Sequence, residues 1–277
     1  MAVKDFDWDG QVDFGGTKLP EQTPIDNVVV IEQEVEPRKG GQHPIVVLVL
    51  DRSGSMNATD TEENVSRIEL VKRYAKDFVN TQSISDADKE LIEFCVVTFG
   101  SDVEILQDFT PMSESKVDFD SLQAGGLTSL YSALIVAVKL ARERKNKLIA
   151  TGTPCFKPVI FLVTDGRPEG ENDLKMEDAC RQILHSYVDA EDGKSPRMRL
   201  FVCGMDKCDM SLMDSLCDDK QIIALRNADA LKEAFALLTK SVAAMSVSDV
   251  NDLLHLSFEN IENLGVLKGH QKVAKLN

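Results

Sequence analysis

The sequence IVVLVLDRSGS, residues 45–55, places a carboxylate and two hydroxyls directly after a run of six aliphatic residues. Branched aliphatic side chains without polar alternation are typical of a strand that is covered on both faces of a parallel sheet. In open α/β sheets, ligands bind outside the carboxyl ends of such strands. Asp51, Ser53 and Ser55 therefore follow a buried strand, at a place suited to a hard cation.

Two later segments add oxygen donors to the same expected edge of the sheet. Thr128 stands near the glycine pair 125–126 and opens an apolar helical stretch, and Asp165 closely follows a second buried run at residues 159–163. Mg²⁺ prefers oxygen ligands and keeps several of its waters, so a few hydroxyls and carboxylates suit it. We therefore predict a Mg²⁺ site, with Mn²⁺ or Ca²⁺ as alternative ions, formed by Asp51, Ser53, Ser55, Thr128 and Asp165.

Each of these motifs also has a simpler explanation. Ser and Asp are preferred at strand-to-helix turns because they hydrogen-bond backbone N–H groups, so residues 51–55 alone could form a capped turn. The order of the three motifs and their places at strand ends favour the metal site over separate turns.

In this order and on these elements, the five residues resemble the metal-ion-dependent adhesion site of von Willebrand factor A domains. The resemblance covers roughly residues 44–245, and within the family it is strongest to the small bacterial cytoplasmic type, such as the TerY-like proteins of tellurite resistance. It is carried by VLDRSGSM at 49–56, FCVVTF at 94–99, GGLTSL at 125–130 and NADALKEAF at 227–235. Leu127 is a departure, because TerY-like proteins usually place the threonine directly after the glycine pair.

The resemblance implies a role for each predicted ligand. In the family, the serines bind the metal directly, the threonine binds directly or through water, and at least one aspartate acts through water. An ion with so little direct anionic charge stays electrophilic, and an Asp or Glu of a partner protein can take its open position. The resemblance further suggests a kinase and phosphatase pair or an AAA+ ATPase of the chelatase type as partner, in a stress-resistance system.

The remaining pattern predicts an α/β fold of the Rossmann-like, doubly wound type, with a mainly parallel six-stranded sheet and helices on both faces. Residues 100–102 form a turn too short for a crossover, so the strands beside it must pair antiparallel and give one antiparallel edge strand. The expected strands are 45–50, 91–99, 103–106, 158–164, 197–203 and 222–224, and the expected helices are 65–79, 128–144, one ending near 188, 210–217 and 229–244.

Composition divides the chain into a single domain at 44–245, an N-terminal extension at 1–43 and a C-terminal extension at 246–277. The first extension is rich in Asp, Glu, Gly and Pro and holds one strand-like piece at 27–31. The second has weak helical periodicity at 250–261 and a basic finish. The N-terminal extension could pack back on the domain or dock on a partner, and we expect the former.

Charge and hydropathy exclude several classes of partner. With 46 acidic and 31 basic residues the net charge is −15, which argues against nucleic acid or an anionic membrane surface. Neither an apolar run of about 18 residues nor a secretory signal is evident, and we expect a cytoplasmic protein. The six cysteines include no CxxC pair, and we expect reduced, structural thiols rather than a zinc site at Cys203, Cys208 and Cys217.

Two other functions are alternatives to a non-enzymatic interaction module. Asp51 could be the nucleophile of a Mg²⁺-dependent phosphohydrolase, but phosphatases of the haloacid dehalogenase type need a second aspartate two residues on, where Ser53 stands. Gly125 and Gly126 could form a phosphate loop, but no GxxxxGK[ST] motif is present. We therefore expect no enzymatic activity.

Overall fold

A computed structural model describes residues 41–171, 174–189, 197–205, 208–218, 221–225 and 228–247. Its centre is a six-stranded sheet with the order β3-β2-β1-β4-β5-β6. Neighbouring strands pair parallel except for β2 and β3, which pair antiparallel and confirm the predicted edge. The strands are β1 (Ile45–Asp51), β2 (Glu93–Phe99), β3 (Val103–Pro111), β4 (Val159–Thr164), β5 (Arg199–Gly204) and β6 (Gln221–Ala224).

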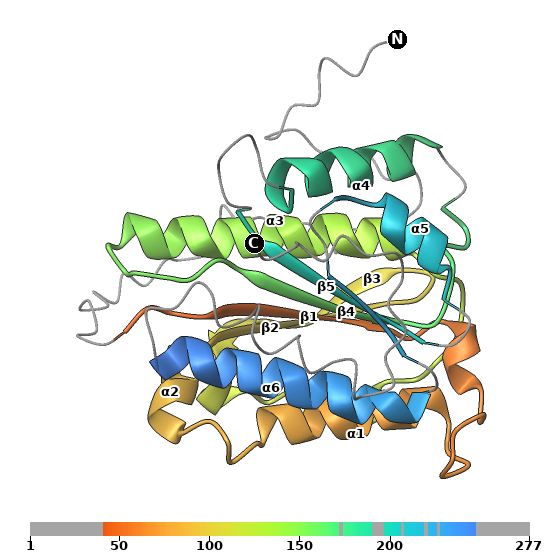
Figure 1. Cartoon of the computed structure of the whole chain (residues 1–277), viewed down its shortest axis with the longest axis horizontal. Coiled ribbons are helices and arrows are strands. Elements are labelled where there is room, and N and C mark those ends of the chain that lie inside the picture. Colours follow the sequence, from red (N-terminus) through yellow and green to blue (C-terminus); the bar gives the residue numbers. More distant parts are fainter. Residues whose placement is uncertain are drawn as a thin grey trace, which may run out of the picture.

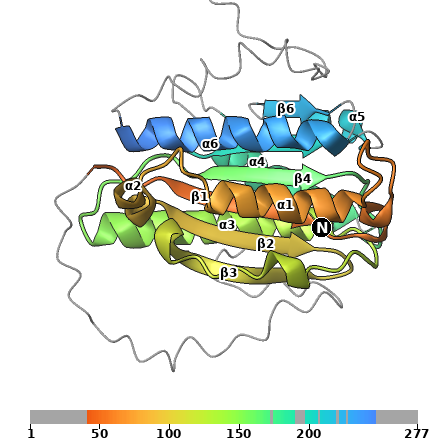
Figure 2. The same ribbon diagram turned by 90° about the horizontal axis from the view of Figure 1, so that it is seen from below.

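Helices cover both faces of this sheet (Figure 1). On one face lie α1 (Arg67–Val79), α2 (Asp86–Leu91) and α6 (Leu231–Val247). On the other face lie α3 (Leu130–Ala150), α4 (Leu174–Tyr187) and α5 (Met210–Ser215). From below, α1 and α6 run side by side across the sheet (Figure 2). The arrangement confirms the predicted doubly wound α/β fold.

Two hydrophobic cores explain why β1 lacks polar alternation. Val46, Leu48 and Leu50 pack into the core under α1 and α6, whereas Val47 and Val49 pack into the core under α3 and α4. All five side chains are fully buried, as a central strand with helices on both faces requires.

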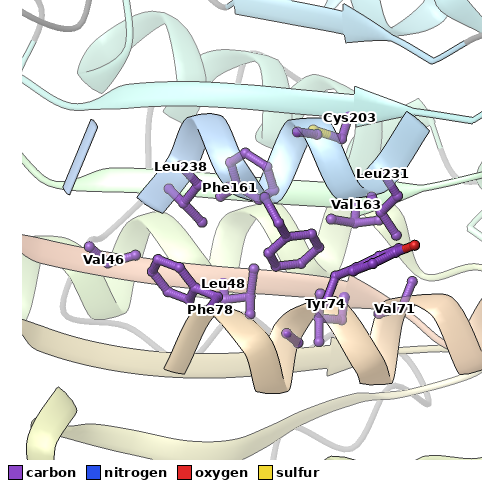
Figure 3. Close-up of a cluster of buried hydrophobic side chains, with 14 of the residues drawn as sticks. Val46, Leu48, Val71, Tyr74, Phe78, Phe161, Val163, Cys203, Leu231 and Leu238 are labelled. Atoms are coloured by element: carbon purple, nitrogen blue, oxygen red, sulfur yellow. The ribbon is translucent and has the colours of Figure 1, made fainter. Parts of the chain in front are cut away.

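Aromatic side chains fill the first core. Phe235 of α6 lies with its ring centroid 5.5 Å from that of Phe161 in β4 and 6.4 Å from that of Phe78 in α1. In Figure 3, Phe78 and Phe161 point into the space between α1 and α6 together with Leu238. This packing holds both helices on the strands that carry the predicted ligands.

The strand register places the ends of β1 and β4 side by side. Leu50 pairs with Val163, so Asp51 at the end of β1 lies level with Thr164, the last residue of β4. From β1 the chain passes to β2 on one side and later returns to β4 on the other side. Ligands of open α/β sheets bind at such a switch point.

Most predicted elements are present with shifted ends. Helix α3 extends to Ala150, and β3 extends to Pro111. The six-residue helix α2 was not predicted. The predicted strand-like piece at 27–31 and the periodic stretch at 250–261 lie outside the described residues, as do the two extensions apart from 41–43 and 246–247, so the domain limits stay a prediction.

Two further observations concern the thiols and the apolar character of the helices in the described part of the chain. All six cysteines are free thiols, and all except the half-buried Cys155 are buried. Within the described ranges, no helix combines the length and apolar character needed to cross a membrane.

Candidate metal centre

Asp51 ends β1 with its carboxylate fully buried. Its Oδ1 accepts a hydrogen bond from the backbone N–H of Ser53 at 2.7 Å, and its Oδ2 accepts one from the hydroxyl of Thr164 at 2.6 Å. Both oxygens are therefore held by the chain itself, which fixes the orientation of the carboxylate. Thr164 was not among the predicted site residues.

The simpler explanation of this motif holds for Asp51, which accepts a backbone hydrogen bond in the turn, but not for Ser53. Ser53 precedes the short 3₁₀ helix Gly54–Asn57, yet its side chain makes no capping hydrogen bond there. Its Oγ lies 3.1 Å from the Oγ of Ser55, and Ser55 donates a hydrogen bond to Oδ1 of Asp165 at 2.6 Å. The hydroxyls thus turn toward the ends of β1 and β4.

Thr128 lies in the loop before α3, and its hydroxyl and that of Ser55 both lie near Gly166. An ideal Cβ built at Gly166 lies 3.7 Å from the Thr128 Oγ1 and 3.8 Å from the Ser55 Oγ. Gly166 directly follows Asp165, so a side chain there would enter the space beside both hydroxyls. Thr128 and Asp165 are also buried, with 3% and 0% exposure.

Backbone hydrogen bonds tie the Thr128 loop to the loop after β1. The N–H of Gly54 donates to the carbonyl of Gly126 at 3.0 Å, and the N–H of Gly125 donates to the carbonyl of Arg52 at 2.8 Å. Gly126 has φ of 78°, and a Cβ there would lie 2.3 Å from the Oγ of Ser101. A side chain would be strained by both the backbone and its neighbour.

The loop after β4 holds Thr128 from the other side. Thr128 and Glu169 exchange two backbone hydrogen bonds, of 3.3 and 3.0 Å. The carboxylate of Glu171 accepts hydrogen bonds from the N–H groups of Tyr131 and Ser132 in the first turn of α3, at 2.8 and 3.0 Å. A carboxylate is favourable at a helix N-terminus, so Glu171 anchors the helix that follows Thr128.

Arg67 is a buried cation at the site that the sequence reasoning missed. It begins α1 with 1% exposure, and its Nη1 donates to Oδ2 of Asp165 at 2.6 Å. Its Nε donates to Oδ1 of Asp60 at 2.8 Å, and its Nη2 donates to Oδ2 of Asp60. Burial alone would lower the pKa of Arg67, but pairing with Asp60 and Asp165 outweighs it and raises this pKa.

The buried carboxylates make the site attractive to a cation. Burial raises the pKa of Asp51 to about 6, hydrogen bonds from Ser53 and Thr164 limit the rise, and the charge of Asp165 adds to it. A cation beside Asp51 would offset the cost of burying this charge. The donor set, hydroxyls and carboxylates alone, fits a hard divalent ion such as Mg²⁺.

The structure brings the five predicted residues to one edge of the sheet, on three loops that hydrogen-bond to one another. It adds Thr164, Arg67 and Asp60, which support the predicted ligands. One signal could have revealed Arg67: a basic residue at a helix N-terminus opposes the helix dipole and needs a compensating partner.

Other groups of potential ligands lie apart from this edge. Within the described ranges, three His, Cys, Asp or Glu side chains converge in one group, formed by His185, Asp189 and Asp218. Cys203, Cys208 and Cys217 do not form such a group among the described residues. His43 lies 3.3 Å from a carboxylate oxygen of Glu93, so it has a structural partner.

Comparison with known families gives a match to part of the domain. Residues 46–167 match the model of the von Willebrand factor type A domain. This segment is therefore similar to a von Willebrand factor type A domain. The matched range holds all five predicted ligands, whereas β5, β6 and α6 of the same sheet and core lie beyond it.

Solved structures with this domain fold show low sequence identity. The PilB minor pilin from Streptococcus sanguinis superposes with a TM-score of 0.52 at 14% identity, over 76% of this chain and 63% of the pilin. The proximal thread matrix protein 1 from the mussel byssus superposes with a TM-score of 0.50 at 19% identity, over 73% of this chain and 47% of the matrix protein. The pilus adhesin SpaC from Lactobacillus rhamnosus GG superposes with a TM-score of 0.51 at 15% identity, over 73% of this chain and 31% of the adhesin.

This chain therefore spans less than two thirds of the length of these three proteins, and the likeness establishes the fold alone. Comparison with curated protein sequences gave no match.

Proposed function

We propose that this von Willebrand factor type A domain is a non-enzymatic interaction module that binds a divalent cation, Mg²⁺ foremost, and captures an Asp or Glu of a partner protein. The observation that carries the proposal is the meeting of Ser53, Ser55, Thr128, Asp51 and Asp165 at one end of the sheet. When bound, the ion would supply an electrophilic position for the partner's carboxylate.

The hydrogen bonds support different roles for the hydroxyls and the carboxylates. Asp51 is engaged at both oxygens, and Asp165 accepts from Ser55 at one oxygen and from Arg67 at the other. Carboxylates held in this way are suited to orient hydroxyls and water. We therefore assign direct contact with the ion to the hydroxyls of Ser53 and Ser55, with Thr128 direct or through water and the aspartates as tuning groups.

Two arginine–aspartate pairs and an exposed leucine lie at the rim of the site. Arg167 is exposed, and its Nε lies 3.0 Å from Oδ2 of Asp209. Arg52 is partly exposed and forms an ion pair with Asp102. Leu127, next to Thr128, keeps 47% of its surface exposed. Because both arginines are already paired with carboxylates, attraction of the partner's carboxylate would fall to the bound ion. The exposed leucine offers apolar area for a flanking side chain.

The burial of Asp51 supports a non-enzymatic role over the phosphohydrolase. A nucleophilic aspartate must reach a phosphorus atom with a free oxygen, whereas both oxygens of Asp51 are hydrogen-bonded and the side chain is fully buried. Phosphatase activity in the presence of Mg²⁺ that is lost on Asp51→Asn would overturn the proposal.

We further propose a TerY-like role in a cytoplasmic stress-resistance system, with a kinase and phosphatase pair or an AAA+ ATPase as partner. The four sequence blocks quoted above support this assignment. Co-purification from the native host with wild-type chain and with the Asp51→Ala variant tests it. Recovery of a protein of neither class, dependent on Asp51, would redirect the assignment.

The metal-binding part of the proposal is tested by calorimetric titration with Mg²⁺ and Mn²⁺. We expect binding by wild type and none by Asp51→Ala. A suitable control is Asp86→Ala, because Asp86 is an exposed aspartate in the first turn of α2. Asp102 is a poor control, since it pairs with Arg52 beside the site.

A further inference from the structure

Arg67 is among the largest fully buried side chains of the protein. A guanidinium is costly to bury unless it is paired and hydrogen-bonded. It also begins α1, where the helix dipole disfavours a positive charge. Hydrophobic packing alone would select another residue at this position. The charge of Arg67 therefore needs a compensating reason.

That reason lies in its two carboxylate partners. Nε and Nη2 of Arg67 donate to the two carboxylate oxygens of Asp60 as a bidentate pair. Nη1 of Arg67 donates to Oδ2 of Asp165 at 2.6 Å. Asp165 is fully buried, whereas the Asp60 side chain is 42% exposed. Water thus helps to solvate Asp60, but Asp165 depends on groups of the protein for its charge.

Hydrogen bonds within the loop before α1 hold Asp60 in place. Thr61 Oγ1 donates to the carbonyl of Val65 at 2.7 Å and accepts from its N–H at 3.0 Å, and the N–H of Arg67 donates to the carbonyl of Ala58 at 2.9 Å. These bonds close the loop around Asp60. The planar fork of Arg67 is held at one edge, so its remaining Nη1 is directed at Asp165.

From this arrangement we propose that Arg67 is the built-in counter-ion of the metal centre, a positioning residue that sets its charge through Asp165. This inference rests on the proposed metal site. With Arg67 on Oδ2, Asp165 turns Oδ1 to Ser55 and presents the hydroxyl, rather than a bare carboxylate, to the ion. The guanidinium also cancels one of the two buried negative charges. The bound ion then keeps positive charge for the partner's carboxylate.

The proposal predicts opposite effects on fold stability and on metal affinity. In Arg67→Met, Asp165 loses its counter-ion, so the melting temperature in EDTA should fall. The same loss leaves more negative charge at the site, so Mn²⁺ should bind at least about tenfold more tightly. Arg67→Lys keeps the positive charge and should restore an affinity close to wild type. A purely structural role would lower stability and metal affinity together.

The test uses the full chain with Mn²⁺ alone as probe, with free Mn²⁺ counted by its electron paramagnetic resonance signal. Arg73→Met is the matched control, because Arg73 lies on the same helix in an exposed pair with Glu63 and should change neither quantity much. Arg67→Gln, which removes the charge but keeps a hydrogen-bond donor, replaces the methionine variant if that variant does not fold.

Three outcomes decide the matter. Tighter Mn²⁺ binding in the neutral variants, reversed by lysine, supports the proposal. Unchanged or weaker binding in folded neutral variants, with normal binding by wild type, overturns the counter-ion role and leaves the metal site standing. Absence of Mn²⁺ binding in wild type overturns both.

Discussion

Ser55 donates a hydrogen bond of 2.6 Å to Asp165, which lies 110 positions later in the chain. The bond joins the loop after β1 to the loop after β4 at the switch point of the sheet. It links a hydroxyl that suits a divalent ion to a carboxylate that Arg67 already engages.

Ser55→Ala should separate metal binding from folding. The substitution removes one hydroxyl ligand and its hydrogen bonds to Asp165 and Ser53, so the unfolding free energy should drop by about 1 to 3 kcal/mol. Stabilisation by Mg²⁺, measured as the rise in melting temperature, should disappear, because a ligand that binds only the folded state stabilises it by mass action. Ser186→Ala, on the exposed face of α4, is the control and should keep the Mg²⁺ effect.

Gly166→Ala should impair the metal site through crowding. Its methyl group would lie 3.7 Å from the Thr128 Oγ1 and 3.8 Å from the Ser55 Oγ, in the space where the ion is expected. Calorimetry should show severalfold weaker Mn²⁺ binding. Gly125→Ala is the matched control, since nothing lies within 4 Å of a Cβ at that position. Equal affinities in the two variants would place the ion elsewhere.

Gly126→Ala should destabilise the Thr128 loop. The residue has φ of 78°, and the added Cβ would meet the Oγ of Ser101 at 2.3 Å. We expect a loss of about 1 to 3 kcal/mol in unfolding free energy, measured by urea titration. A double variant with Ser101→Gly, which removes the obstructing hydroxyl, should recover part of the loss. No recovery would assign the whole cost to the backbone.

The pKa of Asp51 predicts a pH dependence of stability. Because its folded pKa is about 6, above the ordinary 3.8, the folded state holds the proton more tightly than the unfolded state. In metal-free protein this group therefore contributes most stability below about pH 4 and loses about 3 kcal/mol as the pH rises through 6. Stabilisation by Mg²⁺ should grow over the same rise, since the ion competes with the proton.

Urea titrations between pH 4.5 and 7.5, with and without Mg²⁺, check this dependence. Asp51→Asn should remove this contribution and flatten the difference between the two conditions. A wild-type profile identical to that of the asparagine variant would show that Asp51 titrates normally.

Local pattern and chain order were enough to predict that the five candidate ligands share one edge of the sheet. The aliphatic runs before Asp51 and Asp165 mark two central strands, and parallel neighbours bring their carboxyl ends together. Arg67, Asp60 and Thr164 escaped prediction because their roles depend on tertiary contacts, and Arg67 meets Asp165 across 98 positions. Helix α2 has six mostly polar residues, too few for a periodic signal.

Capture of the partner should depend on the ion and on Thr128 together. Thr128→Ala removes a hydroxyl from the third loop and should weaken capture, as should Ser53→Ala and chelation by EDTA. Effects that act through one site should not add, so EDTA should cause little further loss in either variant. A pull-down with a partner co-purified from the native host measures this. Capture that survives both changes would indicate an ordinary interface beside an idle site.

The most direct test of the central claim is titration of the full chain with Mn²⁺, with Mg²⁺ as competitor. We expect one Mn²⁺ site per chain, displaced by Mg²⁺, lost in Asp51→Ala and in Ser53→Ala, and kept in Asp86→Ala. A wild-type chain that binds no Mn²⁺, or binding that persists unchanged in both Asp51→Ala and Ser53→Ala, would contradict this claim.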